Sequence, residues 1–115
     1  MWATTPAATS VVTPRDIEWM AGFIEGEGCF TGGIRNISVQ AAQVNMEPLL
    51  RLQRLLGGSI KVRREAVGNW QRCHGWRVTG TRARGVMMTI YGLMSKRRQG
   101  QIKMALLPDL AKVAA

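Results

Sequence analysis

Acidic side chains are scarce in this chain: its 115 residues include seven Asp and Glu against sixteen Lys and Arg, which gives a formal net charge of +9. Twelve of the sixteen basic residues are Arg and four are Lys. A strong positive charge suits a polyanionic partner, either nucleic acid or an anionic membrane surface. Because the Arg guanidinium forks onto phosphates and guanine edges in a way that Lys does not, the composition favours nucleic acid.

Cysteine, histidine and long apolar segments are also few. The two cysteines are Cys29 and Cys73, the single histidine is His74, and no Cys-x-x-Cys pair occurs, so a zinc site is not expected. No apolar run approaches the ~20 residues of a membrane span, and the first residues lack the pattern of a secretory signal. We therefore expect an intracellular protein with no membrane partner, which keeps both thiols reduced.

The first helix has a marked beginning and end in the sequence. Residues 1–13 are rich in Thr and Ala without periodicity, and they predict a flexible leader. Thr13 is a typical helix N-cap, Pro14 fits the first helical position, and Asp16 follows the cap by three residues. The helix should end near the glycines at 26–28. Its core-facing residues are Ile17, Met20 and Ile24, which recur at helical spacing.

Two pairs of short strands and two further helices follow. Alternating segments predict strands at 29–34, 37–44, 59–65 and 76–81, with a tight turn at Arg35-Asn36 and a loop at 67–75. Apolar spacing predicts a helix over 47–56, stopped by two glycines, and a third over 83–107, ended by Pro108. The order α-β-β-α-β-β-α predicts an α+β domain at 14–108 and a C-terminal tail at 109–115. A four-stranded antiparallel sheet should have its helices on one face.

The other face of this sheet should stay open to a partner. In the alternating strands, Ile60, Val62, Trp76 and Val78 should point inward, so their neighbours point outward. We expect the outward side chains to contact DNA, with Arg35 and Arg72 in loops nearby. Arg97 and Arg98 either touch phosphates or simply solvate the last helix. The outward side chains are Ser38, Gln40, Lys61, Arg63, Arg77 and Thr79.

Glycines and acids gather in one segment, "MAGFIEGEG" at Met20–Gly28, although the rest of the chain is basic. The segment resembles the LAGLIDADG motif of homing endonucleases residue for residue in type. The element order, "LLRLQRLLGGSI" and "SKRRQ" strengthen the resemblance. It implies a saddle-shaped sheet on duplex DNA and a site-specific double-strand endonuclease. Because the chain holds one motif, the resemblance implies a homodimer on a near-palindromic site.

The resemblance also assigns roles to residues. Glu27 matches the acid that binds Mg²⁺ (or Mn²⁺), and the carbonyl of Gly26 or of Gly28 is the expected extra ligand. Lys96 matches a lysine near the active site of some relatives. The polar residue that holds the attacking water falls at Gln43 or Asn45. Phosphodiester hydrolysis suits such a metal, which takes hard oxygen ligands. Glu25 should serve a helix end or the dimer interface. The expected interface residues are Trp19, Gly22, Glu25 and Gly26.

Two other readings remain open on the sequence. A catalytically inactive DNA-binding regulator, or an RNA maturase that assists intron splicing, would keep the basic face and would not need Glu27. A basic scaffold or ribosome-associated protein would bind nucleic acid in a salt-sensitive way without sequence preference. Glu27 is also one methylene longer than the Asp that is commoner in the family.

Overall fold

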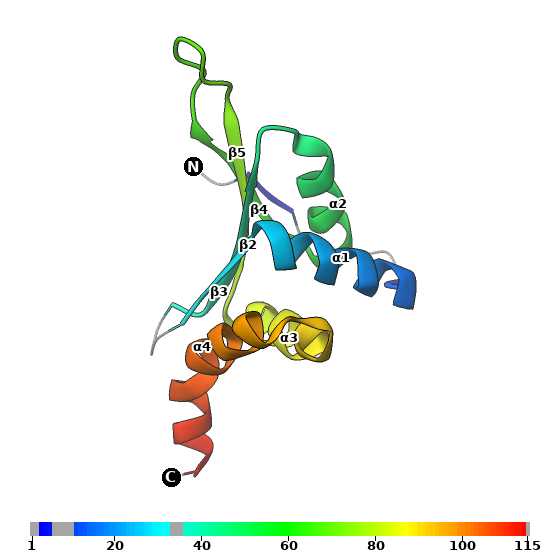
Figure 1. Cartoon of the computed structure of the whole chain (residues 1–115), viewed down its shortest axis with the longest axis vertical. Coiled ribbons are helices and arrows are strands. Elements are labelled where there is room, and N and C mark those ends of the chain that lie inside the picture. The colour runs from blue at the N-terminus through cyan, green and yellow to red at the C-terminus, as the bar shows by residue number, and fades with distance from the viewer. Residues whose placement is uncertain (1–2, 6–10, 33–35, 115) are drawn as a thin grey trace.

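The fold is described from a computed structural model, which describes residues 3–5, 11–32 and 36–114, with side chains at 11–32 and 36–107. Helices separate the strands into a single strand and two consecutive pairs along the chain (Figure 1). No helix in the described part is long and apolar enough to cross a membrane. The elements are β1 Ala3–Thr5, α1 Pro14–Glu27, β2 Gly28–Thr31, β3 Ser38–Gln43, α2 Met46–Leu56, β4 Gly58–Arg64, β5 Cys73–Thr79, α3 Gly80–Ile90, the 3-10 turn η1 Tyr91–Leu93 and α4 Lys96–Ala114.

The α+β architecture with an antiparallel sheet is confirmed, and the sheet has one strand more than the four predicted. Its order is β1-β4-β5-β3-β2. The additional strand, β1, pairs with β4 through Ala3↔Ile60, Thr4↔Ser59 and Thr5↔Gly58. It comes from the segment that we expected to be a flexible leader. A short edge strand gains its hydrogen bonds from a distant partner, so local composition does not reveal it.

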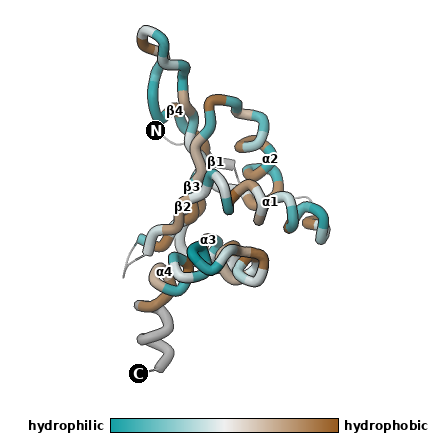
Figure 2. Tube along the Cα trace, viewed as in Figure 1, coloured by the Kyte–Doolittle hydropathy of each residue, from teal (hydrophilic) through white to brown (hydrophobic). Residues whose placement is uncertain are grey.

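The helices cover one face of the sheet, and Figure 1 shows the other face without a helix on it. The inward side chains Val39, Trp76 and Val78 are at most 2% exposed. They pack against Ile24 of α1 and Leu52 of α2 in one hydrophobic cluster, which α3 and α4 also join. Figure 2 shows hydrophobic segments where the strands meet the helices and a hydrophilic outer end of α1.

The beginning of α1 is as the sequence predicts. Thr13 accepts a hydrogen bond from the Asp16 main-chain N–H, and the Asp16 carboxylate accepts one from the Thr13 main-chain N–H at 3.0 Å. This reciprocal capping box satisfies two main-chain donors at the helix start. It also lowers the pKa of Asp16, mainly through the Thr13 main-chain N–H. At the end of α2, Gly57 has φ 73°, which a glycine adopts without strain.

The predicted third helix is wrong in two respects. Residues 83–107 do not form one helix, because α3 ends at Ile90 and α4 begins at Lys96. The interruption contains η1, in which Leu93 is 53% exposed. Pro108 does not end α4, whose backbone continues to Ala114. A proline removes one hydrogen-bond donor from a helix and strains it, at a cost of about 3 kcal/mol, but it does not force the chain to stop there.

Candidate active site

The carboxylate of Glu27 lies at the junction of α1 and β2. It is exposed and, among the described residues, has no hydrogen-bond or ion-pair partner. The next residue, Gly28, begins β2 directly and donates its main-chain N–H to the Ile24 carbonyl. A Cβ at residue 28 would lie 2.5 Å from Ile24 Cγ2 and 2.7 Å from the Ile24 carbonyl oxygen. A glycine is therefore required for α1 to pass into β2 here, and that passage fixes where Glu27 lies.

Two other glycines of the motif leave part of the α1 surface bare. Gly22 and Gly26 are exposed, and a Cβ on either would meet nothing within 4 Å. Beside them Trp19 stacks on Phe23 with ring centroids 5.5 Å apart. The guanidinium of Arg51 from α2 covers the Trp19 ring at 4.0 Å. A side chain at either glycine would therefore contact nothing else in the described part of the chain, and a flat strip of backbone flanked by aromatic rings faces outward.

Glu25, the first acid of the motif, points away from Glu27 and into the chain. Its Oε1 accepts the main-chain N–H of Ser95 at 2.7 Å, and its Oε2 accepts the Ser95 hydroxyl at 2.9 Å. Arg98 donates from Nε to the Glu25 carbonyl at 3.0 Å. The pKa of Glu25 is lowered, first by the Ser95 main-chain N–H. The Glu25 carboxylate thus bonds to the start of α4 in the same chain.

Arg98 is therefore not a surface residue. It is 7% exposed, and its guanidinium donates to Glu25 and, at 2.8 Å, to Gln101 Oε1. The prediction that it touches phosphates does not fit this burial. Sequence reasoning also missed Ser95, whose hydroxyl caps α4 by accepting the Arg98 N–H at 3.2 Å. A serine three residues before Arg98 was the available signal, because Ser is a favoured N-cap.

The remaining two catalytic candidates lie at the same end of the sheet as Glu27. Gly28 pairs with Ala41 in β3, and Gln43 follows two residues further along that strand. Gln43 pairs with His74, whose buried Nδ1 has no hydrogen-bond partner among the described residues. Lys96 is exposed and directly follows Ser95. The strand pairing thus places Gln43 near the α1–β2 junction, and Ser95 does the same for Lys96.

The sheet face without helices, here the open face, is polar and basic. Strand pairing places Cys29, Gln40, Arg77 and Ser59 side by side across four strands. Lys61 and exposed Thr79 share this side, and no acidic residue occupies an outward position of the described strands. Ser38 also lies here but is only 4% exposed; its hydroxyl pairs with that of Thr31 and accepts from Gln40 Nε2 at 3.2 Å. Ser38 therefore positions Gln40 and offers little surface of its own.

Solved structures with this arrangement are homing endonucleases. I-CvuI, in complex with the I-CreI target in the presence of Mg, aligns with a TM-score of 0.66 and 20% identity over 81% of this chain and 64% of that one. Group I intron-encoded I-CeuI, complexed with DNA, gives 0.62 and 13% over 90% and 58%, and I-TnaI gives 0.53 and 17% over 76% and 66%. No protein-family model matches the sequence, and no curated protein matches it by sequence.

This chain has the homing-endonuclease fold. The resemblance drawn from Met20–Gly28 is thereby confirmed at the level of the fold. At these identities the likeness establishes the fold alone, and this chain spans 64% of the length of I-CvuI. The roles of its residues must therefore be argued from its own geometry.

In this fold the β4–β5 hairpin extends beyond the helices, as Figure 1 shows. A register shift between Val62 and Arg64 leaves Arg63 without a strand partner, so the predicted alternation ends there. Val62, predicted to be inward, is 39% exposed because no helix covers this part of the sheet. At the tip, Arg72 pairs with Glu65 at 2.9 Å. Arg35, the other predicted loop contact, lies outside the described residues.

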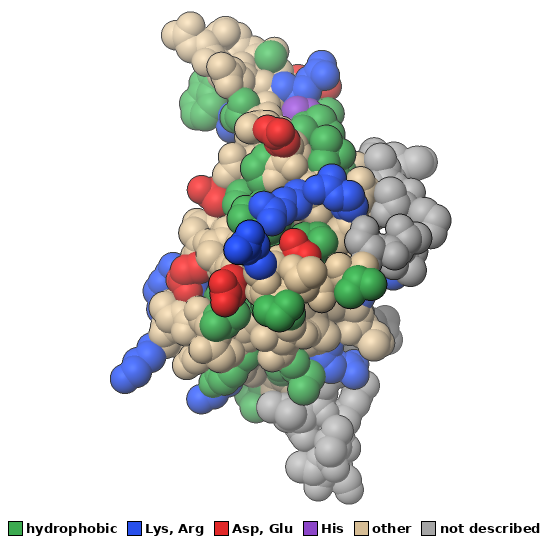
Figure 3. All heavy atoms as spheres, turned by 90° about the vertical axis from the view of Figure 1, so that its right-hand side faces the viewer, with side chains coloured by type: hydrophobic (Ala, Val, Ile, Leu, Met, Phe, Trp, Pro, Cys, Tyr) green, Lys and Arg blue, Asp and Glu red, His purple; other side chains and the backbone are tan. Residues whose placement is uncertain are grey.

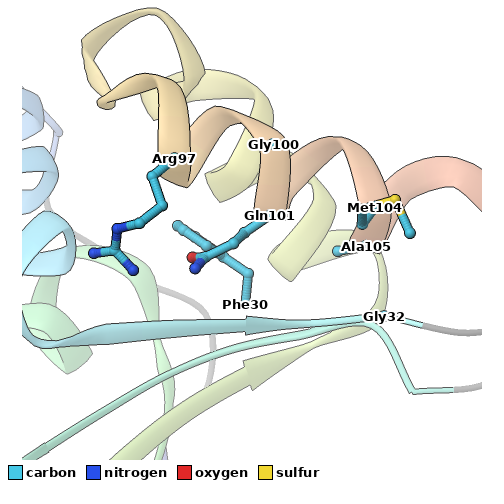
Figure 4. A pocket seen from close by; sticks show the side chains of 7 residues that line it. All are labelled: Phe30, Gly32, Arg97, Gly100, Gln101, Met104 and Ala105. Carbon is cyan, nitrogen blue, oxygen red and sulfur yellow. The ribbon is translucent and has the colours of Figure 1, made fainter.

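The last predicted DNA contact, Arg97, borders a groove of about 640 Å³ between β2 and α4. Figure 4 shows Arg97 and Gln101 reaching down from α4 toward the ring of Phe30 on β2. A Cβ at Gly32 would overlap the Ala105 backbone, so a glycine allows β2 and α4 to approach closely.

Figure 3 looks onto the helix side and shows acidic side chains scattered among basic ones, unlike the open face.

The described residues contain no group of three or more acidic, Cys or His side chains that could hold a metal ion within one chain. Glu27 is the one carboxylate of the motif that is free to act as a ligand, because both oxygens of Glu25 are engaged by Ser95.

Proposed function

We propose that this chain is a site-specific double-stranded DNA endonuclease of the LAGLIDADG homing type, which acts as a homodimer with Mg²⁺ or Mn²⁺. The observation that carries the proposal is the exposed Glu27 at the end of a helix whose outer surface is bared by Gly22 and Gly26. The homing-endonuclease fold supports it. I-CvuI and I-CeuI were solved in complex with DNA, and I-CvuI in the presence of Mg, so we expect this chain to bind DNA and Mg²⁺.

The shape of α1 supports the proposed dimer. Two helices approach most closely where side chains are smallest, and nothing within the described chain fills the space above Gly22 and Gly26. The stacked Trp19 and Phe23 would add apolar area beside that contact. A two-fold axis along this strip would bring both copies of Glu27 to one place, because Glu27 directly follows Gly26. Glu25 is not part of this proposal, since it bonds to Ser95.

The donor set fits a hard divalent cation. Two Glu27 carboxylates, one from each copy, offer charged oxygens, and the main-chain carbonyl of Gly26 is the proposed extra ligand. When bound, such a cation polarises a phosphate and offsets the charge that develops on the leaving oxygen. Lys96 is proposed to add positive charge next to the scissile phosphate. The Gln43 side chain is proposed to orient the attacking water.

The open face is proposed to read the DNA. Gln40 and Arg77 lie opposite each other on β3 and β5, with Lys61 on β4, and these types suit base edges in the major groove. Thr79, Arg63 and Arg72 are proposed to extend this surface, and Arg97 to contact phosphate. The absence of acids at the described outward positions keeps this face attractive to a polyanion.

A cleavage screen tests the proposal. Purified protein is incubated with a plasmid library of randomised target sites and Mg²⁺, and cleaved molecules are sequenced. Cutting at a near-palindromic site supports the proposal, and Glu27→Gln should lower the cleavage rate at least ~10²-fold while DNA affinity stays within about threefold. Glu47→Gln, which removes one exposed carboxylate from α2, is the matched control.

The alternatives give different results when binding to the DNA library and to structured RNA is measured beside cleavage. Sequence-specific binding without cleavage would contradict the endonuclease and support a DNA-binding regulator. Preferential binding of structured RNA would support a maturase, and salt-sensitive binding without sequence preference would support a basic scaffold. Cleavage retained in Glu27→Gln would contradict the assignment of the metal ligand.

A further inference from the structure

The last turn of α1 and the first turn of α4 are joined by a set of hydrogen bonds, here called the clamp, made by Glu25, Ser95 and Arg98. The Glu25 carboxylate accepts the Ser95 N–H and hydroxyl at 2.7 and 2.9 Å. In return, Arg98 of α4 donates to the Glu25 main-chain carbonyl at 3.0 Å. Glu25 and Ser95 are 70 residues apart in sequence, so this contact is a feature of the fold.

The electrostatics of both helix ends favour the clamp. A carboxylate at the start of α4 meets the positive end of that helix dipole, and a guanidinium at the end of α1 meets the negative end of the other. Arg98 is 7% exposed, and its side chain lies against the ring of Phe30 at 5.8 Å. A buried guanidinium with bonds to Glu25 and Gln101 has few other positions. The clamp is therefore preorganised.

The clamp lies between two residues of the proposed site. Glu27 follows Glu25 by two positions, and Lys96 directly follows Ser95. Both are exposed and have no partner among the described residues, so no contact of their own side chains sets the distance between them. The relative position of α1 and α4 therefore determines the distance between the main chain of Glu27 and that of Lys96.

We propose that Glu25 is a positioning residue for the cleavage reaction. Through its hydrogen bonds to Ser95, it fixes the position of Lys96 relative to Glu27. This inference rests on the proposed function. It removes Glu25 from the predicted dimer interface, because both carboxylate oxygens accept hydrogen bonds within the chain. It also gives the two acids of the motif separate roles: Glu27 acts at the scissile phosphate, and Glu25 holds α1 and α4 together.

A first experiment tests the clamp without any cleavage. Amide hydrogen exchange is followed by NMR in the wild type, Glu25→Ala, Ser95→Ala and Ser95→Thr. Loss of the carboxylate should speed exchange at Ser95, and loss of the hydroxyl should speed exchange at Arg98, each about tenfold or more. Ser95→Thr keeps the hydroxyl and the main-chain N–H and should retain protection at both amides. Exposed Glu47→Gln is the control for charge. Unchanged protection of Ser95 in Glu25→Ala, which leaves no acceptor for its N–H, would overturn the clamp.

A second experiment asks whether the clamp acts through Lys96. Single-turnover cleavage rates and DNA affinity in Ca²⁺ are measured for Glu25→Gln, Lys96→Ala and the double variant. A displacement of about 1 Å can cost ~10²-fold in rate, so Glu25→Gln should slow cleavage roughly 10- to 100-fold with affinity within about threefold. The Lys96→Ala loss should be several-fold smaller in the Glu25→Gln background.

The outcomes separate the two proposals. Equal Lys96→Ala losses in both backgrounds would overturn the positioning role, because a purely structural Glu25 gives independent effects. A wild type that binds but never cuts contradicts the proposed function. In that case amide exchange still decides whether Glu25 fixes the start of α4.

Discussion

Gly28 and Ile24 are in direct contact at the end of α1: the Gly28 N–H donates to the Ile24 carbonyl, and a Cβ at residue 28 would lie 2.5 Å from Ile24 Cγ2. Ile24 itself is fully buried. Neither side of this contact can move without disturbing the core, so the helix end and the strand that follows are rigidly joined. The last glycine of the motif thus has a steric reason that is independent of any ligand.

Replacing Gly28 by alanine should therefore damage both stability and the site. The added methyl must displace Ile24 or the backbone, which should lower the free energy of unfolding by about 1–3 kcal/mol. Urea unfolding measures this loss. Gly85→Ala in α3 is the matched control, because a Cβ there meets nothing within 4 Å and should not destabilise the chain. An unfolding free energy equal to that of the wild type would contradict the close contact.

Gly26→Ala should have the opposite effect on the single chain and still weaken the dimer. Alanine at an open helical position raises helix stability by up to ~1 kcal/mol. The same methyl would separate two helices that pack along Gly22 and Gly26, so sedimentation should show dissociation at higher protein concentrations than for the wild type. An unchanged monomer–dimer equilibrium, with Gly85→Ala as control, would remove the strip around Gly26 from the interface.

The sequence predicts α1 well because its signals are local. Thr13, Pro14 and Asp16 are neighbours, and the residues that form the capping box are all visible in a few letters. The alternation of β4 and β5 also predicts correctly that Trp76 and Val78 face inward. These patterns depend on the period of each element, so no tertiary information is needed.

The features that the sequence does not predict depend on distant contacts. Strand β1 forms by pairing with β4. Buried Arg98 has a partner in the Glu25 main-chain carbonyl, which accepts a hydrogen bond from its guanidinium. Before folding, Arg98 is indistinguishable from its exposed neighbour Arg97. The glycine motif predicts the location of Glu27, but the task of Glu25 becomes visible only when Ser95 is placed beside it.

Stability should fall on acidification because of two carboxylates. Folding lowers the pKa of Asp16 through Thr13 and of Glu25 through Ser95, from ordinary values of 3.8 and 4.5. As pH falls below these values the unfolded chain binds protons first, so the stabilisation is present above about pH 4.5 and is lost through the folded pKa values. Melting temperature should therefore drop between about pH 5 and about pH 3.

Variants that lack these two carboxylates show how much of the fall in melting temperature at low pH they cause. Asp16→Asn with Glu25→Gln should lower the melting temperature near neutral pH and flatten its decline in acid. The control is Glu18→Gln, an exposed residue of α1 without a hydrogen bond among the described residues, which should leave the decline unchanged. An equally steep decline in the double variant would show that other groups cause it.

Arg77 and Arg97 should affect DNA binding in different ways. Arg77 lies in the middle of the open face beside Gln40 and Ser59, whereas Arg97 is exposed at the start of α4. Arg77→Ala should cost about 1–3 kcal/mol of discrimination at one base position in each half-site, because a base contact carries sequence information. Arg97→Ala should weaken binding to all sequences alike and reduce the salt slope by about 1. Affinity measured on a target library at several salt concentrations separates the two, and identical profiles for both variants would contradict reading by the open face.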